Sequence, residues 1–334
     1  MRYNLVIGVD VSKETLDFVV LEGGNVLFHL QTGNNSKGVN QLYNKLNKVN
    51  SATENWLFCL EHTGIYCNPI LDYLLSKGIA VWLESASKVK AFHSLERGKN
   101  DALDALRIAE YAYLKMEKAV IWQPPRNIIK QLKSLLKLRE RLLTSKKRLL
   151  DPLKEEKRFV KESWVSEHEK LIRPVITKIK LQLRDIDQKI KLLIQQDKRL
   201  HSTFEKISSV CGVGQIVAAN TLVVTNEFKR ISCPKKMACH CGVAPFKYDS
   251  GKSVRSRSKV SHRADKSMKA LLHMAALSAI NCQGELQDYY LRKVAEGKNK
   301  MSILNAIRNK IIHRIYACVR ENRKYEKSYA YTLV

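Results

Sequence analysis

The chain of 334 residues is long enough for about two domains of common size, and its hydrophobic fraction of 45% is ordinary for a globular protein. Lysine and arginine outnumber aspartate and glutamate by 59 to 32, a formal charge of +27, so the expected partner is the polyanion nucleic acid. The apolar runs fall short of the ~20 residues of a membrane span, no signal peptide precedes the first strand, and the eight cysteines form no disulfide framework. We therefore expect a cytoplasmic protein without a membrane segment.

Residues 4 to about 114 predict an α/β domain. Three short apolar runs separated by turn-forming residues predict a meander of three strands, after which helical and strand patterns alternate. The expected strands are 5–9, 16–21, 26–31, 56–60 and 79–83, and the expected helices are 36–49, 68–77 and about 101–114. Sequential strands followed by this alternation indicate a mixed sheet covered by helices.

Four acids of this domain predict a metal site. Asp10 lies in the apolar run VIGVDVSKETLDFVVLEGG, where an unpaired charge would be costly, and Glu61 closes the apolar strand NWLFCLE in the same way. Asp101 and Asp104, three residues apart in GKNDALDALRIAEYA, share one helix face. Converging carboxylates need a cation, and Mg²⁺ prefers their oxygens, so a pair of ions here would suit displacement at a phosphodiester.

Each acid also has a structural explanation when taken alone. Asp101 could cap its helix, with Asn100 as an alternative cap, Asp104 could be a first-turn acid favoured by the helix dipole, and Glu61 could pair with a lysine. The stretch IGVDVSKE is also similar to the first phosphate loop of actin-like sugar kinases and chaperone ATPases, but Ser12 stands where those loops usually carry glycine. The acids at two apolar strand ends favour the cation site.

After Pro124 and Pro125 a long, charged helical segment is expected over 123–202. Its apolar residues recur in pairs every seven positions and then at alternating spacings of four and three. The pairs are Ile128/Ile129, Leu135/Leu136, Leu142/Leu143 and Leu149/Leu150, and the later positions are Ile172, Ile176, Ile179, Leu183, Ile186, Ile190, Leu193 and Leu200. This pattern predicts either an antiparallel helical hairpin or an oligomerising coiled coil.

Residues 203–334 predict a second, mostly helical and strongly basic domain. The stretch SVCGVGQIVAANTLVV has the form of a helix-hairpin-helix with its turn at Gly212 and Gly214. Such a turn aims backbone N–H groups at a phosphate, or needs glycine for its geometry alone. A nearby cluster lacks the paired spacing of a zinc site and is interpreted as small buried residues: Cys233, Cys239, His240 and Cys241.

The segment 241–279 combines basic residues with serines, which suits phosphate binding, although a disordered basic loop is the alternative. Ser250, which precedes glycine in YDSG, is a candidate nucleophile with His240 or His262 as candidate bases. The residues alone favour phosphate binding over nucleophilic attack. The candidate nucleic-acid contacts are Lys247, Lys252, Arg255, Arg257, Lys259 and Arg263.

The chain resembles the DEDD transposases of the IS110 insertion-sequence family over nearly its whole length. The resemblance rests on the order of the four acids, Asp10 in GVDVSK, then Glu61, then Asp101 and Asp104 in KNDALDA, followed by GVGQIVAANTL and GVAPFKYDSGKSVRSRSK. The resemblance implies a RuvC-like domain with an RNase H fold (1–122), a coiled-coil linker (123–202) and a C-terminal transposase domain (203–334). It implies that the acids bind Mg²⁺, that Ser250 acts with them in strand cleavage and exchange, and that a bridge RNA pairs with donor and target DNA.

Two positions depart from the family pattern near the serine. Ser256 and Ala264 stand where the family often has glycine, and SHRA replaces its usual S-K-x-G, so Ser253 or Ser256 stay open as alternative nucleophiles. The sequence predicts a Mg²⁺-dependent transposase that works as a homo-oligomer, a dimer or a tetramer. The alternatives are a nuclease of the Holliday-junction resolvase type, which would use water, and a non-catalytic assembly protein that binds RNA or DNA.

Overall fold

The computed structural model describes residues 3–93, 100–250, 254–260 and 264–326, and the chain divides into two compact units, Met1–Pro124 and Pro125–Val334. The first unit buries a hydrophobic cluster on each face of a sheet, and the second is built around one large cluster of helical residues. The chain thus passes from one unit to the other between two consecutive prolines. The further boundary at residue 202 stays a prediction.

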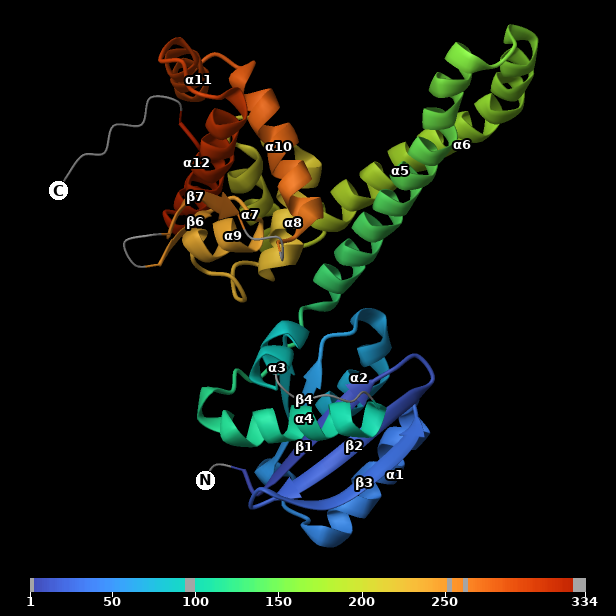
Figure 1. The fold of residues 1–334 in the computed structure, drawn as a ribbon, viewed down its shortest axis with the longest axis vertical. Helices are drawn as coiled ribbons and strands as arrows, with labels where there is room; N and C mark the ends of the chain where they lie inside the picture. Colours follow the sequence, from blue (N-terminus) through green and yellow to red (C-terminus); the bar gives the residue numbers. More distant parts are fainter. Residues whose placement is uncertain (1–2, 94–99, 251–253, 261–263, 327–334) are drawn as a thin grey trace, which may run out of the picture. The chain divides into compact units, whose positions relative to one another are not determined.

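The first unit contains a five-stranded mixed sheet with the strand order β3-β2-β1-β4-β5 (Figure 1). Its strands are β1 (Leu5–Val11), β2 (Thr15–Glu22), β3 (Asn25–Gly33), β4 (Trp56–Glu61) and β5 (Ala80–Glu84). The first three form an antiparallel meander, and β4 runs parallel to β1 and β5 parallel to β4. The predicted meander is confirmed, and this strand order is that of the RNase H-like fold.

Helices cover both faces of the sheet. They are α1 (Ser36–Val49), α2 (Asn68–Ser76), α3 (Ala86–Phe92) and α4 (Asp101–Leu114), with 3-10 turns at Thr53–Asn55, Gly64–Cys67 and Met116–Lys118. Residues of α1 and α2 pack on one face, and α4 packs on the other. The predicted helices 36–49 and about 101–114 are confirmed. Helix α3 was not predicted, because its seven residues bury only Val89 and show no amphipathic period.

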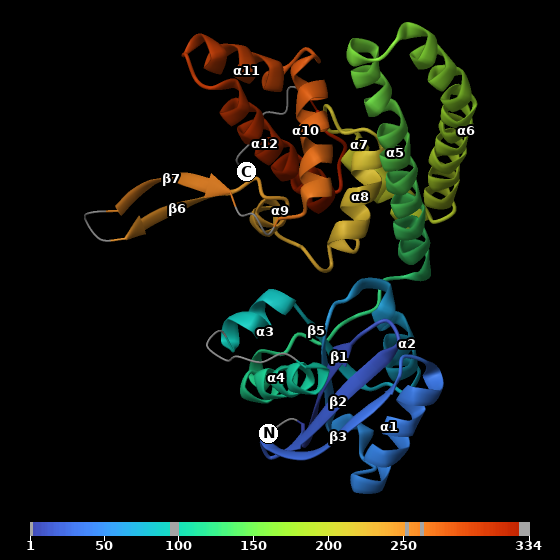
Figure 2. The same cartoon turned by 45° about the vertical axis from the view of Figure 1, so that its right-hand side comes forward.

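The second unit begins with two long helices, α5 (Asn127–Phe159) and α6 (Glu162–Gln195), which pack side by side as a hairpin (Figure 2). Intramolecular packing therefore accounts for the heptad pattern, as in the first alternative that the sequence left open. Ile190 and Ile194, near the end of α6, belong to the same core as the helices that follow. Any oligomerising role of the hairpin stays a prediction.

Six further helices and a two-stranded β-hairpin complete the second unit. They are α7 (Lys198–Ser208), α8 (Gln215–Thr225), α9 (Pro234–His240), α10 (Lys266–Ile280), α11 (Glu285–Ala295) and α12 (Lys300–Arg320), with β6 (Pro245–Ser250) and β7 (Val254–Val260). The β-hairpin was not predicted, because β7 consists largely of serine and basic residues and β6 has no regular alternation of apolar and polar residues. Within the described ranges, no helix is both long and apolar enough to cross a membrane.

The chain is anchored inside each unit on either side of their boundary. In the first unit, the Trp122 amide donates to the Val81 carbonyl beside β5 (2.7 Å). In the second, Arg126 donates through Nε and Nη2 to the Glu227 carboxylate (2.9 and 2.6 Å) and through Nη1 to Asp197 (2.5 Å). These bonds fix the start of α5 to the helices that follow it.

Candidate active site

Asp10 and Glu61 lie side by side at one edge of the sheet. Val9 of β1 is paired with Leu60 of β4 in the parallel register, so the next residue of each strand is one of the two acids. Because side chains alternate along a strand, both acids project from the sheet face that α4 covers. Strands β1 and β4 are therefore neighbours, and their two acids emerge at the same end of the sheet.

Gly8 brings the other two acids to this edge. It lies in β1 beneath α4, and a Cβ atom added to it would lie 2.2 Å from the Ala105 carbonyl oxygen and 2.4 Å from the Ala109 amide nitrogen. Only glycine allows the backbones of strand and helix to come so close. As a result the first turn of α4, with Asp101 and Asp104, lies near the carboxyl end of β1.

Replacing Gly8 with alanine is expected to destabilise the first unit by about 3 kcal/mol or more, because the atoms that the new methyl group meets belong to the backbone and cannot rotate away. The free energy of unfolding in urea measures the loss. Gly214→Ala is the control, since its Cβ meets nothing within 4 Å. An equal effect of the two substitutions would show that the contact between β1 and α4 is not tight.

The first turn of α4 leaves both of its acids available. The Asn100 side chain caps the helix by accepting a hydrogen bond from the Leu103 amide (2.8 Å), so Asp101 does not cap it. Asp101 is exposed, and Asp104 accepts a hydrogen bond from Arg107 (3.3 Å), one turn along the helix. The alternative in which Asp101 is only a cap is thereby removed.

The electrostatics show that the four acids affect one another. The pKa of the Asp10 carboxyl is raised to about 6, first by burial and then by the negative charge of other carboxylates. Those carboxylates are, in order of effect, Asp101, Asp104, Glu61 and Asp17. Burial also raises the pKa of Glu61, which Lys90 opposes and Asp104 reinforces. A cation at this edge would relieve the repulsion.

Two further acids at the same edge were missed in the sequence. Asp17 of β2 is directly opposite Asp10 and only 2% exposed, and it accepts hydrogen bonds from His29 (3.1 Å) and Gln31 (3.0 and 3.2 Å). Glu84 closes β5 beside Glu61, is 7% exposed, and accepts from Lys88, Tyr111 and the Ser85 amide. The signal available was an acid inside the apolar run of β2 for Asp17 and an acid at the end of the apolar strand β5 for Glu84.

The outer and inner acids of this row therefore differ. Asp17 and Glu84 have hydrogen-bond donors, whereas the side chains of Asp10 and Glu61 have none among the described residues. Buried carboxylates are normally paired or bound to a cation. The half-buried inner pair is thus the part of the edge whose carboxylates are free to bind a cation.

The donor set fits a hard divalent cation, although the carboxylates have not converged on one point. In the part of the chain that the structure describes, no three His, Cys, Asp or Glu side chains are close enough to hold one ion. Mg²⁺ keeps several waters and often takes only one or two carboxylates, so it does not need a closed protein cage. Rotamer changes of the exposed acids would supply the remaining oxygens.

Ser250 is the last residue of β6, and its backbone is paired with Val254 at the start of β7. Lys247 lies at an irregularity in the same strand, and Arg255, Arg257 and Lys259 belong to β7. The residues that join the strands, 251–253, lie outside the described residues, so the predicted turn at Gly251 and the contact at Lys252 are not described. The same holds for Arg263.

The helix-hairpin-helix is present as α7, a turn and α8. Gly212 has φ +83°, and a Cβ atom there would lie 2.3 Å from the Ala275 carbonyl oxygen of α10, so packing alone requires glycine. Gly214 starts α8 and has open space around its Cα, which leaves it free to approach a phosphate. Of the cysteines near α9, Cys241 is buried as predicted, whereas Cys233 and Cys239 are only half-buried.

Comparison with solved structures gives two structures of the Holliday-junction nuclease RuvC of Thermus thermophilus. The first, a complex with a Holliday-junction substrate, is 15% identical, covers 36% of this chain and 100% of its own, and has a TM-score of 0.29. The second is 16% identical, covers 35% of this chain and 99% of its own, and has a TM-score of 0.25.

Two curated relatives match nearly the whole chain, and a third matches about half of it. The pilin gene-inverting proteins of Moraxella lacunata and Moraxella bovis are each 25% identical over 327 residues, which is 96% of this chain and 97% of theirs. A protein of insertion element IS116 from Streptomyces clavuligerus is also 25% identical, over 47% of this chain and 40% of its own.

Two family models match successive parts of the chain. The DEDD transposase model of IS110 matches residues 7–155, which include all four acids of the sheet edge. The model of the transposase IS116/IS110/IS902 family matches residues 204–291, which include the turn at Gly212 and the β-hairpin with Ser250. With both models matched in order, and with the sheet topology and acids described above, this chain belongs to the IS110 family of DEDD transposases.

Proposed function

We propose that this transposase cuts and rejoins DNA with Mg²⁺ bound at the sheet edge and with Ser250 as the nucleophile. Asp10, Glu61, Asp101 and Asp104 would hold the metal. The observation that carries this proposal is the pair of inner acids, Asp10 and Glu61, which are partly buried beside other carboxylates and lack hydrogen-bond donors among the described side chains. When bound, Mg²⁺ would stabilise the charge that develops on the attacking and leaving oxygens of the phosphodiester.

The serine role follows from the need to rejoin strands. Attack by the Ser250 hydroxyl oxygen forms a serine phosphodiester and releases one DNA hydroxyl, and a second DNA hydroxyl can then displace the serine with no external energy source. Attack by water instead leaves a free phosphate end. The names of the Moraxella relatives describe inversion of a pilin gene, and inverting a DNA segment requires rejoining. This supports the serine over water.

The basic second unit would hold nucleic acid, namely donor and target DNA and a bridge RNA. The net charge of +27 supports this role, as does the strand β7, which carries Arg255, Arg257 and Lys259 at alternate positions. We propose the same nucleic-acid-binding role for Lys247, Lys252 and Arg263 from their place in the basic, serine-rich segment of the sequence. Gly214 would approach a phosphate, while Gly212 would set the turn.

A homo-oligomer would assemble through the helical hairpin. Five large apolar residues of α6 are exposed, and three of them, Trp164 (56%), Leu171 (69%) and Val175 (50%), follow one another at spacings of seven and four; the residues of α6 that are buried are separate from them. Exposed apolar residues with regular helical spacing support contact with a second copy. Recombination, which must hold two duplexes together, gives such an assembly its purpose.

Two rival functions use the same residues differently. A nuclease of the resolvase type would need the acids but no serine, and a non-catalytic assembly protein would need neither. Trapping a covalent protein–DNA adduct distinguishes the first rival from the proposal, and any Mg²⁺-dependent nicking excludes the second.

Metal-dependent nicking tests the proposal and has a defined pH dependence. The substrate is a supercoiled plasmid that carries the DNA flanking the gene, with RNA transcribed from that DNA added. Mg²⁺ binds the ionised carboxylate, and the pKa of Asp10 is about 6. As the pH rises toward 6, the Mg²⁺ concentration for half-maximal nicking should therefore decrease by up to about tenfold per pH unit, and above about pH 6 it should become constant. Assays at pH 5, 6, 7 and 8 measure this, with EDTA as the blank.

Nicking that persists in EDTA would exclude a metal at this edge. A Mg²⁺ requirement that stays constant from pH 5 to pH 8 would instead show that Asp10 is not the carboxyl that limits metal binding.

A further inference from the structure

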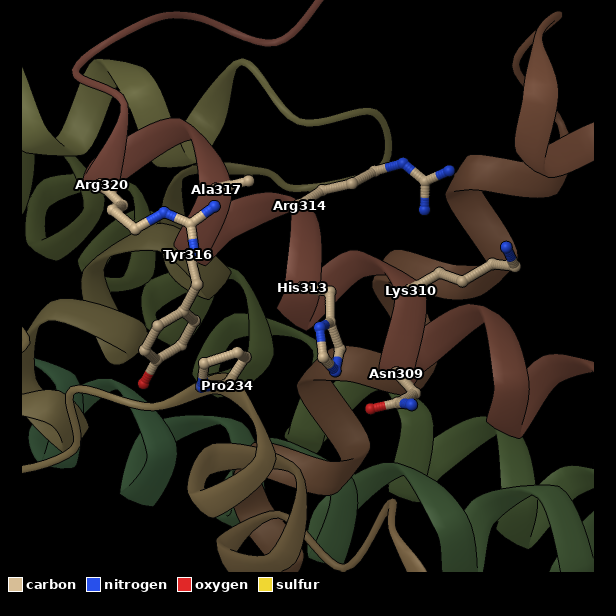
Figure 3. Close-up of a pocket in the computed structure, with 8 residues that line it drawn as sticks. All are labelled: Pro234, Asn309, Lys310, His313, Arg314, Tyr316, Ala317 and Arg320. Carbon is tan, nitrogen blue, oxygen red and sulfur yellow. The ribbon is translucent and has the colours of Figure 1, made fainter. Parts of the chain in front are cut away.

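The second unit has a pocket on the outer side of α12, with a volume of about 460 Å³ (Figure 3). It is lined by Pro234, Asn309, Lys310, His313, Arg314, Tyr316, Ala317 and Arg320. Four of these eight side chains are basic and none is acidic. The pocket involves neither the acids of the sheet edge nor the serine segment, so it is a separate site.

The floor of the pocket is rigid. The Tyr316 hydroxyl donates to the Ile231 carbonyl (2.7 Å), and the Tyr316 ring packs edge to face against Phe228 (4.9 Å between centroids). Tyr316 is consequently 7% exposed, and Pro234 lies beside it. A fixed aromatic and apolar floor suits a flat ligand more than a hydrated ion.

The cations lie around this floor. In Figure 3, His313 stands in the middle of the pocket, Lys310 and Arg314 extend to one side of it, and Arg320 lies on the other. Arg314 donates to Glu285 of α11 (2.5 Å), which fixes its guanidinium, and Lys310 lies over the Tyr289 ring (4.8 Å to the centroid). The charged groups of Lys310, Arg314 and Arg320 therefore lie at the edges of the pocket, and the exposed imidazole of His313 lies between them (Figure 3).

Asn309 provides the observation that points to a ligand. Its side-chain oxygen is buried and has no hydrogen-bond partner within the described part of the chain. A buried acceptor without a partner costs stability, which suggests that a donor reaches it when the pocket is filled. An amide side chain offers one acceptor and one donor, the combination that pairs with the edge of a nucleobase such as adenine.

We propose that this pocket binds one unpaired nucleotide of a single-stranded nucleic acid. The base stacks on His313 and pairs with the Asn309 amide, and the flanking phosphates contact Lys310 and Arg320. A volume of about 460 Å³ accommodates a nucleotide, whereas a lone phosphate would leave most of it empty. The base edge is accessible only when the base is unpaired, so duplex DNA does not fill the pocket. This proposal rests on the proposed function in one respect only, namely that the ligand is a nucleic acid.

The test uses full-length protein without Mg²⁺, so that cleavage plays no part. Fluorescence anisotropy measures the affinity for a 12-nucleotide RNA, the DNA of the same sequence and the matching DNA duplex, in about 0.2 M salt to suppress non-specific contacts. We expect His313→Ala to weaken binding of a single strand by about fivefold or more and His313→Phe, which keeps a stacking ring, to restore it. Binding of the duplex should not change.

Two further substitutions distinguish binding in the pocket from non-specific electrostatic attraction to the basic surface. Lys310→Gln should weaken single-strand binding and lower its salt dependence, whereas Lys300→Gln at the start of α12, with the same change of charge, should do neither. Asn309→Leu removes a buried acceptor that lacks a partner, so we expect a slightly higher melting temperature together with weaker binding.

Ultraviolet crosslinking of the same oligonucleotides, followed by mass spectrometry, locates the contact. A crosslink within residues 309–320 supports the pocket, and whether RNA or DNA gives it identifies the natural source of the nucleotide. No crosslink there with either strand, or equal losses for single strand and duplex in His313→Ala, would overturn the proposal. Because no cleavage is measured, failure of this test leaves the proposed catalysis untouched, and failure of cleavage leaves this binding untouched.

Discussion

Replacing Asp10 with asparagine is expected to abolish Mg²⁺-dependent cleavage, by roughly 10³-fold or more, while nucleic-acid binding stays close to that of the unchanged protein. The reason is that Asp10 is one of the two inner acids, and a neutral amide of the same shape cannot hold the cation between them. Plasmid nicking measures cleavage, and anisotropy with the same DNA measures binding. Unchanged cleavage would remove Asp10 from the active site.

The same substitution should stabilise the metal-free protein. The pKa of Asp10 is raised in the fold, from 3.8 to about 6, so ionising it there costs more than in the unfolded chain. That cost is absent below pH 3.8, grows as the pH rises and is complete above about pH 6. At pH 7.5 without metal, Asp10→Asn should therefore melt a few degrees higher, and Mg²⁺ should no longer raise its melting temperature.

Asp17→Asn is the matched control, because it makes the same chemical change on the adjacent strand. Asp17 is buried and accepts hydrogen bonds from His29 and Gln31, so its loss should lower the melting temperature instead. If both substitutions moved the melting temperature in the same direction, the distinction between paired outer acids and unpaired inner acids would be wrong.

Replacing Ser250 with alanine is expected to eliminate any covalent protein–DNA adduct and to lower strand exchange to background. The substitution removes the hydroxyl oxygen that is proposed to form the bond to phosphorus and leaves the acids that are proposed to hold the metal unchanged. Denaturing gels of a radiolabelled substrate, stopped with detergent, measure the adduct. An adduct that persists would move the nucleophile elsewhere.

Ser253→Ala and Ser256→Ala are the controls. These two serines remain the alternative nucleophiles if the family pattern is shifted by a few residues relative to this segment. Each should retain the adduct. Loss of the adduct in only one of them would identify that serine as the nucleophile. Hydrolysis that continues in Ser250→Ala without any adduct would favour the resolvase type of nuclease.

Much of the first unit could be predicted because its sequence patterns are local. Helices 36–49 and about 101–114 were predicted where the structure has them, and Asn100, which the sequence offered as an alternative to Asp101, is the cap of the second. Two apolar strands that each end in an acid singled out Asp10 and Glu61, but did not show that these strands are neighbours. Register and burial then placed these acids on one face of the sheet.

The features that escaped prediction depend on contacts far apart in the sequence. In the sequence, Gly8 is an ordinary glycine in an apolar strand. Its importance depends on the contact with α4, which lies about a hundred residues further along the chain. Asp17 acquires its partners only when β3 pairs with β2. The β-hairpin of β6 and β7 has few apolar residues, so nothing in its composition distinguishes a strand from a basic loop. The pocket of α12 combines residues from two helices, and no short motif marks it.

The anchors on either side of the boundary have a consequence for how the molecule can be built. Trp122 is bonded to the strand-β5 side of the first unit, and Arg126 is bonded to the turn that follows α8, so only Gln123, Pro124 and Pro125 lie between fixed points. A chain cut between the two prolines loses no bond of either core. We therefore expect that the two units can be produced as separate polypeptides, cut between Pro124 and Pro125, and that each keeps the hydrogen bonds of its own core.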